Sequence, residues 1–268
     1  MRVILICVLL VMSTMALAQP APPLINPVGA GADSATLRPD AGMDEVLEAL
    51  HERGQNLKEF VADVTLIDND LIMSTQTTRT GKVWAQFKPG GDARLHARFD
   101  KRIEEGKPPQ NDLKEYSLDD GWLVDRDYRA KNEVRRQVAA PGEKVNLFQL
   151  GKGPFPLPIG QEVKSVHEQF DVTKVEPAKD DPPGAIHLQL TPKEKTDLAR
   201  KFQVIDVWVD PATRMPVRIK TIDHNQTTER QTDFTNVKVN PTPGLTDADF
   251  KLPPIDQSGW QRHEEALH

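Results

Sequence analysis

The sequence has few of the residues from which reactive centres are built. Its one cysteine, Cys7, lies in the apolar run near the amino terminus, so the chain that follows this run contains no thiol. Disulfides, cysteine nucleophiles and cysteine metal ligands are therefore excluded from that part of the chain. The sequence also lacks a Gly-x-Ser-x-Gly turn, which presents the nucleophilic serine of many hydrolases.

Histidines and carboxylates are not spaced as a metal site requires. His263 and His268 are five positions apart, which rotates their side chains by about 140° around a helix. The run 68–70 (Asp-Asn-Asp) opens like a calcium loop but has no glycine at the sixth position, so we expect a solvated hairpin turn. The histidines at positions 51, 96, 167, 187 and 224 are each expected on a helix or strand surface. We expect no metal, no cofactor and no enzyme; a hydrolase of exported lipid or glycan is the weakest alternative.

Basic residues do not gather on one face. The chain has 34 Lys and Arg against 40 Asp and Glu, a formal net charge of −6, and the two signs are interspersed along the sequence. Binding to nucleic acid needs a concentrated cationic surface, so nucleic acid is not an expected partner.

The amino-terminal segment is typical of exported proteins. Arg2 precedes an apolar or small run from position 3 to 18, which ends in Ala16-Leu17-Ala18. This run is shorter than the roughly 20 residues that span a bilayer, and its small-x-small ending suits signal peptidase. We predict a signal peptide over 1–18, cleaved after Ala18, and a flexible Pro/Gly/Ala leader over 19–40.

Hydrophobic periodicity then predicts one short helix followed by many strands. Met43, Val46, Leu47 and Leu50 recur at helical spacing, and Gly54 is placed to end the helix. The period changes to two from position 60, and turn residues separate the later runs. Further strands are predicted at about 72–80, 82–87, 93–99, 113–118, 121–125, 133–138, 186–190, 203–209, 216–222 and 228–239. Short polar connections favour antiparallel pairing, so the fold class is mainly β with a few helices, built on a large curved antiparallel sheet.

An apolar, proline-rich segment interrupts this rhythm between positions 145 and 160, before a helix expected to contain Val163, Val166 and Phe170. Such a segment could close over one face of the sheet. Its candidate lid residues are Leu147, Phe148, Leu150, Phe155, Leu157 and Ile159.

Between positions 46 and 254, an ordered set of motifs occupies 56–65, 81–89 (Gly-Lys-Val-Trp-Ala-Gln-Phe-Lys-Pro), 119–125 (Asp-Asp-Gly-Trp-Leu-Val-Asp), 188–193 (Leu-Gln-Leu-Thr-Pro-Lys), 205–218, 232–240 and 249–254. In content and order, this set resembles the LolA-type periplasmic carriers of outer-membrane lipoproteins and their relatives LolB and RseB. The resemblance implies an incomplete barrel over 41–254, capped by short helices around an apolar cavity, followed by a tail over 255–268.

Two positions depart from the family pattern. Lys88 stands where the carriers have an arginine that helps to hold the lid, and we include Lys88 among the lid candidates. Arg214 stands where the family turn usually has glycine, which predicts local strain.

The resemblance implies that the protein shelters the acyl chains of lipoproteins or other lipids. The expected acyl-chain contacts are Phe60, Val64, Leu66, Leu95, Phe99, Ile205, Val207, Val209, Val217 and Ile219. Taken singly, each of these side chains is better explained as part of a filled β core, and the cavity rests on the family resemblance. The first hypothesis is a monomeric periplasmic carrier, working with an inner-membrane release complex and an outer-membrane acceptor. The alternative is an RseB-like regulatory module that senses lipid or lipoprotein.

Overall fold

The computed structural model describes residues 36–88, 93–140, 143, 159–256 and 258–267, and these form one twelve-stranded sheet with three short helices. The strand order is β12-β6-β5-β4-β3-β2-β1-β11-β10-β9-β8-β7, and every neighbouring pair is antiparallel except β12 and β6. The strands are β1 (Glu59–Asp70), β2 (Thr75–Phe87), β3 (Ala93–Glu104), β4 (Gln110–Asp119), β5 (Trp122–Asp127), β6 (Asn132–Gln137), β7 (Phe170–Val175), β8 (Ile186–Pro192), β9 (Phe202–Asp210), β10 (Met215–Asp223), β11 (Thr228–Val239) and β12 (Gln261–Glu265). The two described edge strands are β12 and β7, so this sheet is open, and the predicted fold class is confirmed.

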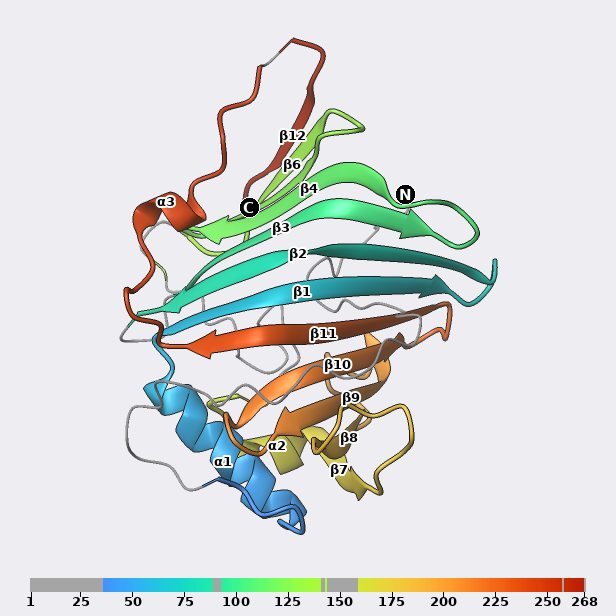
Figure 1. Cartoon of the computed structure of the whole chain (residues 1–268), viewed down its shortest axis with the longest axis vertical. Helices are drawn as coiled ribbons and strands as arrows, with labels where there is room; N and C mark the ends of the chain where they lie inside the picture. Colours follow the sequence, from blue (N-terminus) through green and yellow to red (C-terminus); the bar gives the residue numbers. More distant parts are fainter. Residues whose placement is uncertain (1–35, 89–92, 141–142, 144–158, 257, 268) are drawn as a thin grey trace.

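The helices lie near opposite parts of the sheet (Figure 1). α1 (Met43–Asn56) and α2 (Val163–Gln169) contact each other and β7, whereas α3 (Asp247–Phe250) contacts β3. α1 buries Val46, Leu47 and Leu50, as its periodicity predicts. The helix continues two residues past Gly54, so the prediction that Gly54 ends it is wrong. A Cβ at Gly54 would lie 2.2 Å from the Cα of Gly160, and glycine instead allows a close approach of two backbones.

Hairpin connections explain several differences from the predicted strands. The predicted strand at 72–80 begins at Thr75, because the preceding residues form a turn in which Asp70 Oδ1 accepts the N–H groups of Ile72 and Met73. The side chains at the tip of this turn, Leu71–Met73, are exposed. The helix predicted to contain Phe170 ends one residue earlier, and Phe170 begins β7.

Of the segments near the two ends of the described chain, one packs against the sheet and the other joins it. Leu37, in the predicted leader, is buried, and its N–H donates to Pro211 O. Near the other end, the segment predicted as a tail contains β12, which pairs in parallel with β6. All five residues of β12 are exposed. Among the described residues, no helix has both the length and the apolar character that a membrane span needs.

Candidate functional site

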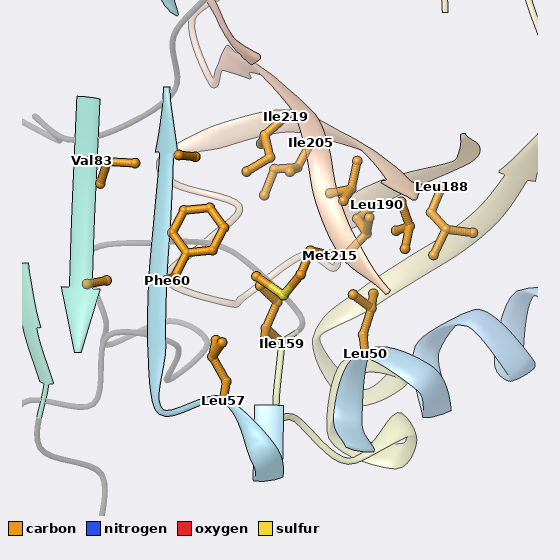
Figure 2. Packing of buried hydrophobic residues seen from close by; sticks show 14 of the residues in the cluster. Leu50, Leu57, Phe60, Val83, Ile159, Leu188, Leu190, Ile205, Met215 and Ile219 are labelled. Carbon is orange, nitrogen blue, oxygen red and sulfur yellow. The ribbon is translucent and has the colours of Figure 1, made fainter. Parts of the chain in front are cut away.

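One face of the sheet, here called the inner face, carries the main hydrophobic cluster. Phe60, Val64 and Leu66 project to this face from β1, and their directly paired neighbours lie on the same face. α1 adds Leu50 to the same cluster, and Figure 2 shows Phe60, Met215 and Ile159 directed toward one another beside it. The inner face therefore carries the candidate apolar binding site.

Strand register arranges the inner face of β1–β5 in cross-strand rows. The first row is entirely apolar and consists of Phe60, Ala85, Leu95, Leu118 and Leu123. The second row changes character along its length and consists of Ala62, Val83, Ala97, Tyr116 and Asp125. The inner face thus passes from hydrocarbon to polar groups toward β4 and β5.

Small side chains are concentrated on β1–β3 of this face. Ala62, Ala85, Ala93 and Ala97 are all buried on the inner face, surrounded by the larger side chains of the same rows. Gly81 lies on the same face, but a different constraint requires glycine there. A Cβ at this position would lie 1.8 Å from Arg98 O, at a bulge between β2 and β3. We name the four alanines the alanine floor. Their alternation along the strands is visible in the sequence, but alanine is too small and too common to stand out in a hydrophobic pattern.

Nine of the ten expected acyl-chain contacts lie in the buried cluster. They come from both halves of the sheet and are Phe60, Val64, Leu66, Leu95, Phe99, Ile205, Val207, Val209 and Ile219. The tenth, Val217, is only half-buried. It lies at a bulge between two paired positions, since Pro216 pairs with Val209 and Arg218 pairs with Trp208. The sequence alternation places Val217 beside Ile219, but the bulge changes the register at this position.

Two of the expected lid residues lie in the described part of the chain. Ile159 is buried in the cluster, and the next residue, Gly160, donates its N–H to Leu50 O at 3.1 Å, which fixes this end of the segment on α1. The other expected members of the apolar segment, Leu147, Phe148, Leu150, Phe155 and Leu157, lie outside the described residues. Lys88 is exposed just past the end of β2. The hydrogen bond and charge of Arg94, followed by the smaller effect of the Lys88 charge, lower the pKa of Asp247.

Ion pairs occupy the polar end of the inner face. Asp112 is 3% exposed and lies 3.3 Å from Arg79 Nη1 and 3.9 Å from Arg102 Nη1. Lys114 Nζ lies 3.2 Å from Asp125 Oδ1 and over the ring of Tyr116. We name Arg79, Arg102, Glu104, Asp112, Lys114, Tyr116 and Asp125 the inner polar cluster.

The pKa values in this cluster reflect burial and close partners. Burial alone would lower the pKa of Lys114, but its interactions with Tyr116 and Asp125 outweigh burial and raise that pKa. Burial raises the pKa of Asp125 and of Tyr116, despite the attraction of Lys114 in each case. The cluster is thus a set of paired groups in surroundings poor in water, directly beside hydrocarbon.

A second polar network lies on the outer face, under α3 and the residues that follow it. His96 Nδ1 lies 2.7 Å from Asp249 O, and its Nε2 lies 3.3 Å from Glu115. Tyr128 donates to the second oxygen of Glu115 at 2.5 Å, and Arg126 donates to Pro253 O at 2.6 Å. His96 is buried here, so the expectation of a surface position for His96 is wrong, whereas His187 is half-buried and stacks on Trp208 at 4.1 Å. Local alternation predicted a solvated outer face but could not show which distant segments cover it.

The described residues contain no group of three or more His, Cys, Asp or Glu side chains placed to hold a metal ion. Within that part of the chain, the arrangement offers an apolar surface, an alanine floor and a charged margin. These features place hydrocarbon and polar groups side by side on one face of the sheet.

Comparisons with known proteins give resemblances of fold. No family model matches the sequence, and no curated protein matches it. Among solved structures, the chain is similar to an uncharacterized conserved protein from Thermus thermophilus, with 14% identity, 82% of this chain and 98% of that chain covered, and a TM-score of 0.45. It is also similar to MucB in the MucA/MucB complex of Pseudomonas aeruginosa, with 14% identity, 81% and 66% coverage, and a TM-score of 0.42.

A third similar structure is a Vibrio parahaemolyticus domain described as a putative outer membrane lipoprotein-sorting protein domain, with 12% identity, 76% and 95% coverage, and a TM-score of 0.32. These are resemblances of fold alone. The chain spans 66% of the MucB chain, and all three TM-scores are below 0.5.

Proposed function

We propose that this protein binds acyl chains on the inner face of its sheet and carries lipid or acylated protein through an aqueous compartment. The alanine floor is the observation that carries this proposal. Where a sheet fills its own core, small and large side chains alternate across the facing layers. Four neighbouring alanines among Phe60, Leu95 and Phe99 make a shallow apolar floor with larger walls, which would take a linear hydrocarbon in place of the atoms that now bury them.

The energetics favour such a shelter. Each buried methylene contributes about 0.8 kcal/mol, so ten methylenes on the floor would contribute about 8 kcal/mol before the costs of association. That is enough for a carrier that retains its cargo and still releases it to an apolar acceptor. Catalytic groups are not needed for this task.

The proposed setting is the periplasm, reached with the signal peptide that the sequence predicts. The proposed partners are lipids or lipoproteins, an inner-membrane release complex and an outer-membrane acceptor. The exposed apolar side chains of Leu71–Met73 lie at the same end of the sheet as the inner polar cluster, since Thr77 near this turn pairs with Glu104. This turn supports the proposal because it gives the loaded protein an apolar tip for contact with an acceptor.

A second candidate is an RseB-like sensing module with a filled core. It is favoured by the burial of nine expected contacts in one continuous cluster. The two candidates differ in whether the alanine floor has space above it.

The experiment combines cargo analysis with one substitution. The chain from Gln19 is expressed in a bacterial periplasm and purified without detergent, and its extracted lipids and bound peptides are identified by mass spectrometry. Ala97→Leu places a larger side chain on the floor. For a carrier, we expect stoichiometric acyl species on the wild type, at least a fivefold lower load on the variant, and a stability of the empty protein within about 1 kcal/mol of the wild type.

The matched control is Thr235→Leu, which adds leucine at an exposed position on the outer face of β11. It should leave the load unchanged. An empty wild type, together with destabilisation of Ala97→Leu by about 1–3 kcal/mol from overpacking, would contradict the carrier function and support the filled-core module.

A further inference from the structure

The inner polar cluster is unusual for its position rather than its ion pairs. Register places Arg79 opposite Leu66 and Lys114 opposite Phe99, so these charges continue the rows of the hydrocarbon surface. A structural ion pair is more easily accommodated on the solvated side of a sheet, because burial penalises each charge. Charged groups on the apolar side of an open sheet are candidates for ligand recognition.

The pairing within the cluster leaves little net charge to attract an ion. Arg79 lies 3.3 Å from Asp112, Arg102 lies 2.7 Å from Glu104, and Lys114 lies 3.2 Å from Asp125. Each of these three cationic side chains is therefore already paired with a carboxylate. A head group with a net charge would therefore introduce an uncompensated charge in a poorly solvated place.

Hydrogen-bonding capacity nevertheless remains unused inside the cluster. Asp112 Oδ1 is a buried acceptor that has no hydrogen-bond partner among the described residues, and Arg102 Nε is a buried donor that has none among them either. The two side chains are neighbours, with Arg102 Nη1 at 3.9 Å from Asp112 Oδ2. Unused buried groups of this kind are rare in folded proteins and are expected to be satisfied by water or by a ligand.

We propose that the inner polar cluster binds the head group of the amphiphile whose acyl chains lie on the alanine floor, and that it selects a head with no net charge that presents a donor beside an acceptor. A phosphoethanolamine head has this chemistry, with its ammonium group directed to Asp112 and its phosphate oxygen to Arg102. A neutral acylamide has it as well, through its N–H and C=O groups. The inference rests on the proposed function and names the ligand class of the same site.

The test measures head-group preference. The chain from Gln19 is stripped of lipid and incubated with equal amounts of phosphatidylethanolamine and phosphatidylglycerol carrying identical acyl chains. The bound lipids are then quantified by mass spectrometry. We expect the wild type to prefer phosphatidylethanolamine, and Asp112→Asn to reduce that preference about tenfold, because it replaces the buried carboxylate. A separate incubation with N-palmitoylethanolamine distinguishes recognition of an amide from recognition of a phosphoethanolamine.

Two further variants make the result specific. Arg102→Lys keeps the positive charge and removes the Nε donor, so it should also reduce the preference for phosphatidylethanolamine. This variant tests the inference even if Asp112→Asn does not fold. Asp233→Asn is the matched control, because Asp233 pairs with Arg218 at 2.5 and 3.2 Å on the outer face. It should retain the wild-type preference.

The outcomes separate the two proposals. Acyl lipid bound by every folded variant with one unchanged head-group ratio would overturn the head-group inference and leave the carrier function standing. A folded wild type that takes up none of these lipids would overturn the carrier function, and the head-group inference with it.

Discussion

At Arg214, side-chain contacts compensate for an unfavourable backbone conformation. Arg214 has φ 55°, in the left-handed region that favours glycine, and it ends the turn between β9 and β10. Its Nη1 lies 2.7 Å from Glu52 on α1, and Arg53 of the same helix donates to Thr213 O at 2.8 Å. Burial, and then the charge of Arg214, lower the pKa of Arg53. The strain expected at Arg214 is present, and the residue holds the turn against α1.

Two substitutions at position 214 separate strain from contact. Arg214→Gly relieves the backbone and loses the partly exposed ion pair, two effects of about 1 kcal/mol each that oppose one another, so we expect a change of less than about 1 kcal/mol. Arg214→Ala loses the ion pair and keeps the strain, and should be about 1 kcal/mol less stable than Arg214→Gly. Urea unfolding of the two variants measures this difference. Equal stabilities would mean that the turn relaxes without cost.

Glu115 supplies a pH-dependent contribution on the outer face. Burial alone would raise its pKa, but hydrogen bonds from His96 and Tyr128 and the charge of Arg98 outweigh burial and lower it. At pH values near these two pKa values, the Glu115 carboxyl group is therefore protonated more often in the unfolded chain than in the folded chain. The stabilising contribution is complete above the unfolded pKa of about 4.3 and is lost as the pH falls through the lower folded pKa.

We therefore predict that the wild type loses more stability than Glu115→Gln between about pH 5 and pH 3. Urea unfolding at several pH values in this range measures the two slopes. Glu105→Gln, at an exposed hairpin position, is the control and should follow the wild type. Parallel curves for the wild type and Glu115→Gln would show that Glu115 does not contribute to the acid response.

Among the elements, those with one buried face were predictable and those without were not. α1 and most strands follow from the spacing of their apolar residues, because each has one buried face. β7 is absent from the predicted strands, and its first residue, Phe170, fits the helical spacing of Val163 and Val166. β12 has no buried residue and so carries no hydrophobic alternation. The inner polar cluster depends on bulges in the pairing of β2, β3 and β4, which local pattern does not reveal.

β12 is joined to the sheet edge by ion pairs as well as by its backbone pairing with β6. Glu264 lies 3.2 Å from Arg135, Glu265 lies 2.6 Å from Arg136, and Arg262 lies 2.9 Å from Glu133. The pairs made by Glu264 and Glu265 are exposed and contribute about 0–1 kcal/mol each, whereas Glu133 is buried. The backbone of β12 also covers the hydrogen-bonding groups at the edge of β6, which would otherwise be available to another chain.

Deleting 261–268 should consequently lower the melting temperature by a few degrees and produce concentration-dependent self-association. Thermal unfolding and light scattering over a tenfold concentration range test both effects. Deletion of 266–268, which keeps β12, is the control. A truncated protein that stays monomeric at every concentration would show that β6 is protected by other means.

At the scale of the whole molecule, the sheet joins two arms of different chemistry. In the arm from β2 to β5, the inner face passes from hydrocarbon to the inner polar cluster. In the arm from β8 to β10, the paired residues Leu188, Val207 and Ile219 are apolar, and α1 and α2 lie beside that arm in Figure 1. The two arms meet at β1, which pairs with β2 on one side and β11 on the other.

This central place of β1 has a consequence for the order in which the chain can fold. β1 is made from the first residues of the sheet, yet one of its neighbours is β11, so that Leu66 pairs with Thr232. The central ladder cannot close until residues as far as 239 are available, and contacts between such distant positions form slowly. In a partly synthesised chain, the edge of β1 would stay unpaired and available for pairing with other chains. Rapid maturation would therefore depend on keeping the early strands apart from other chains until the late strands arrive.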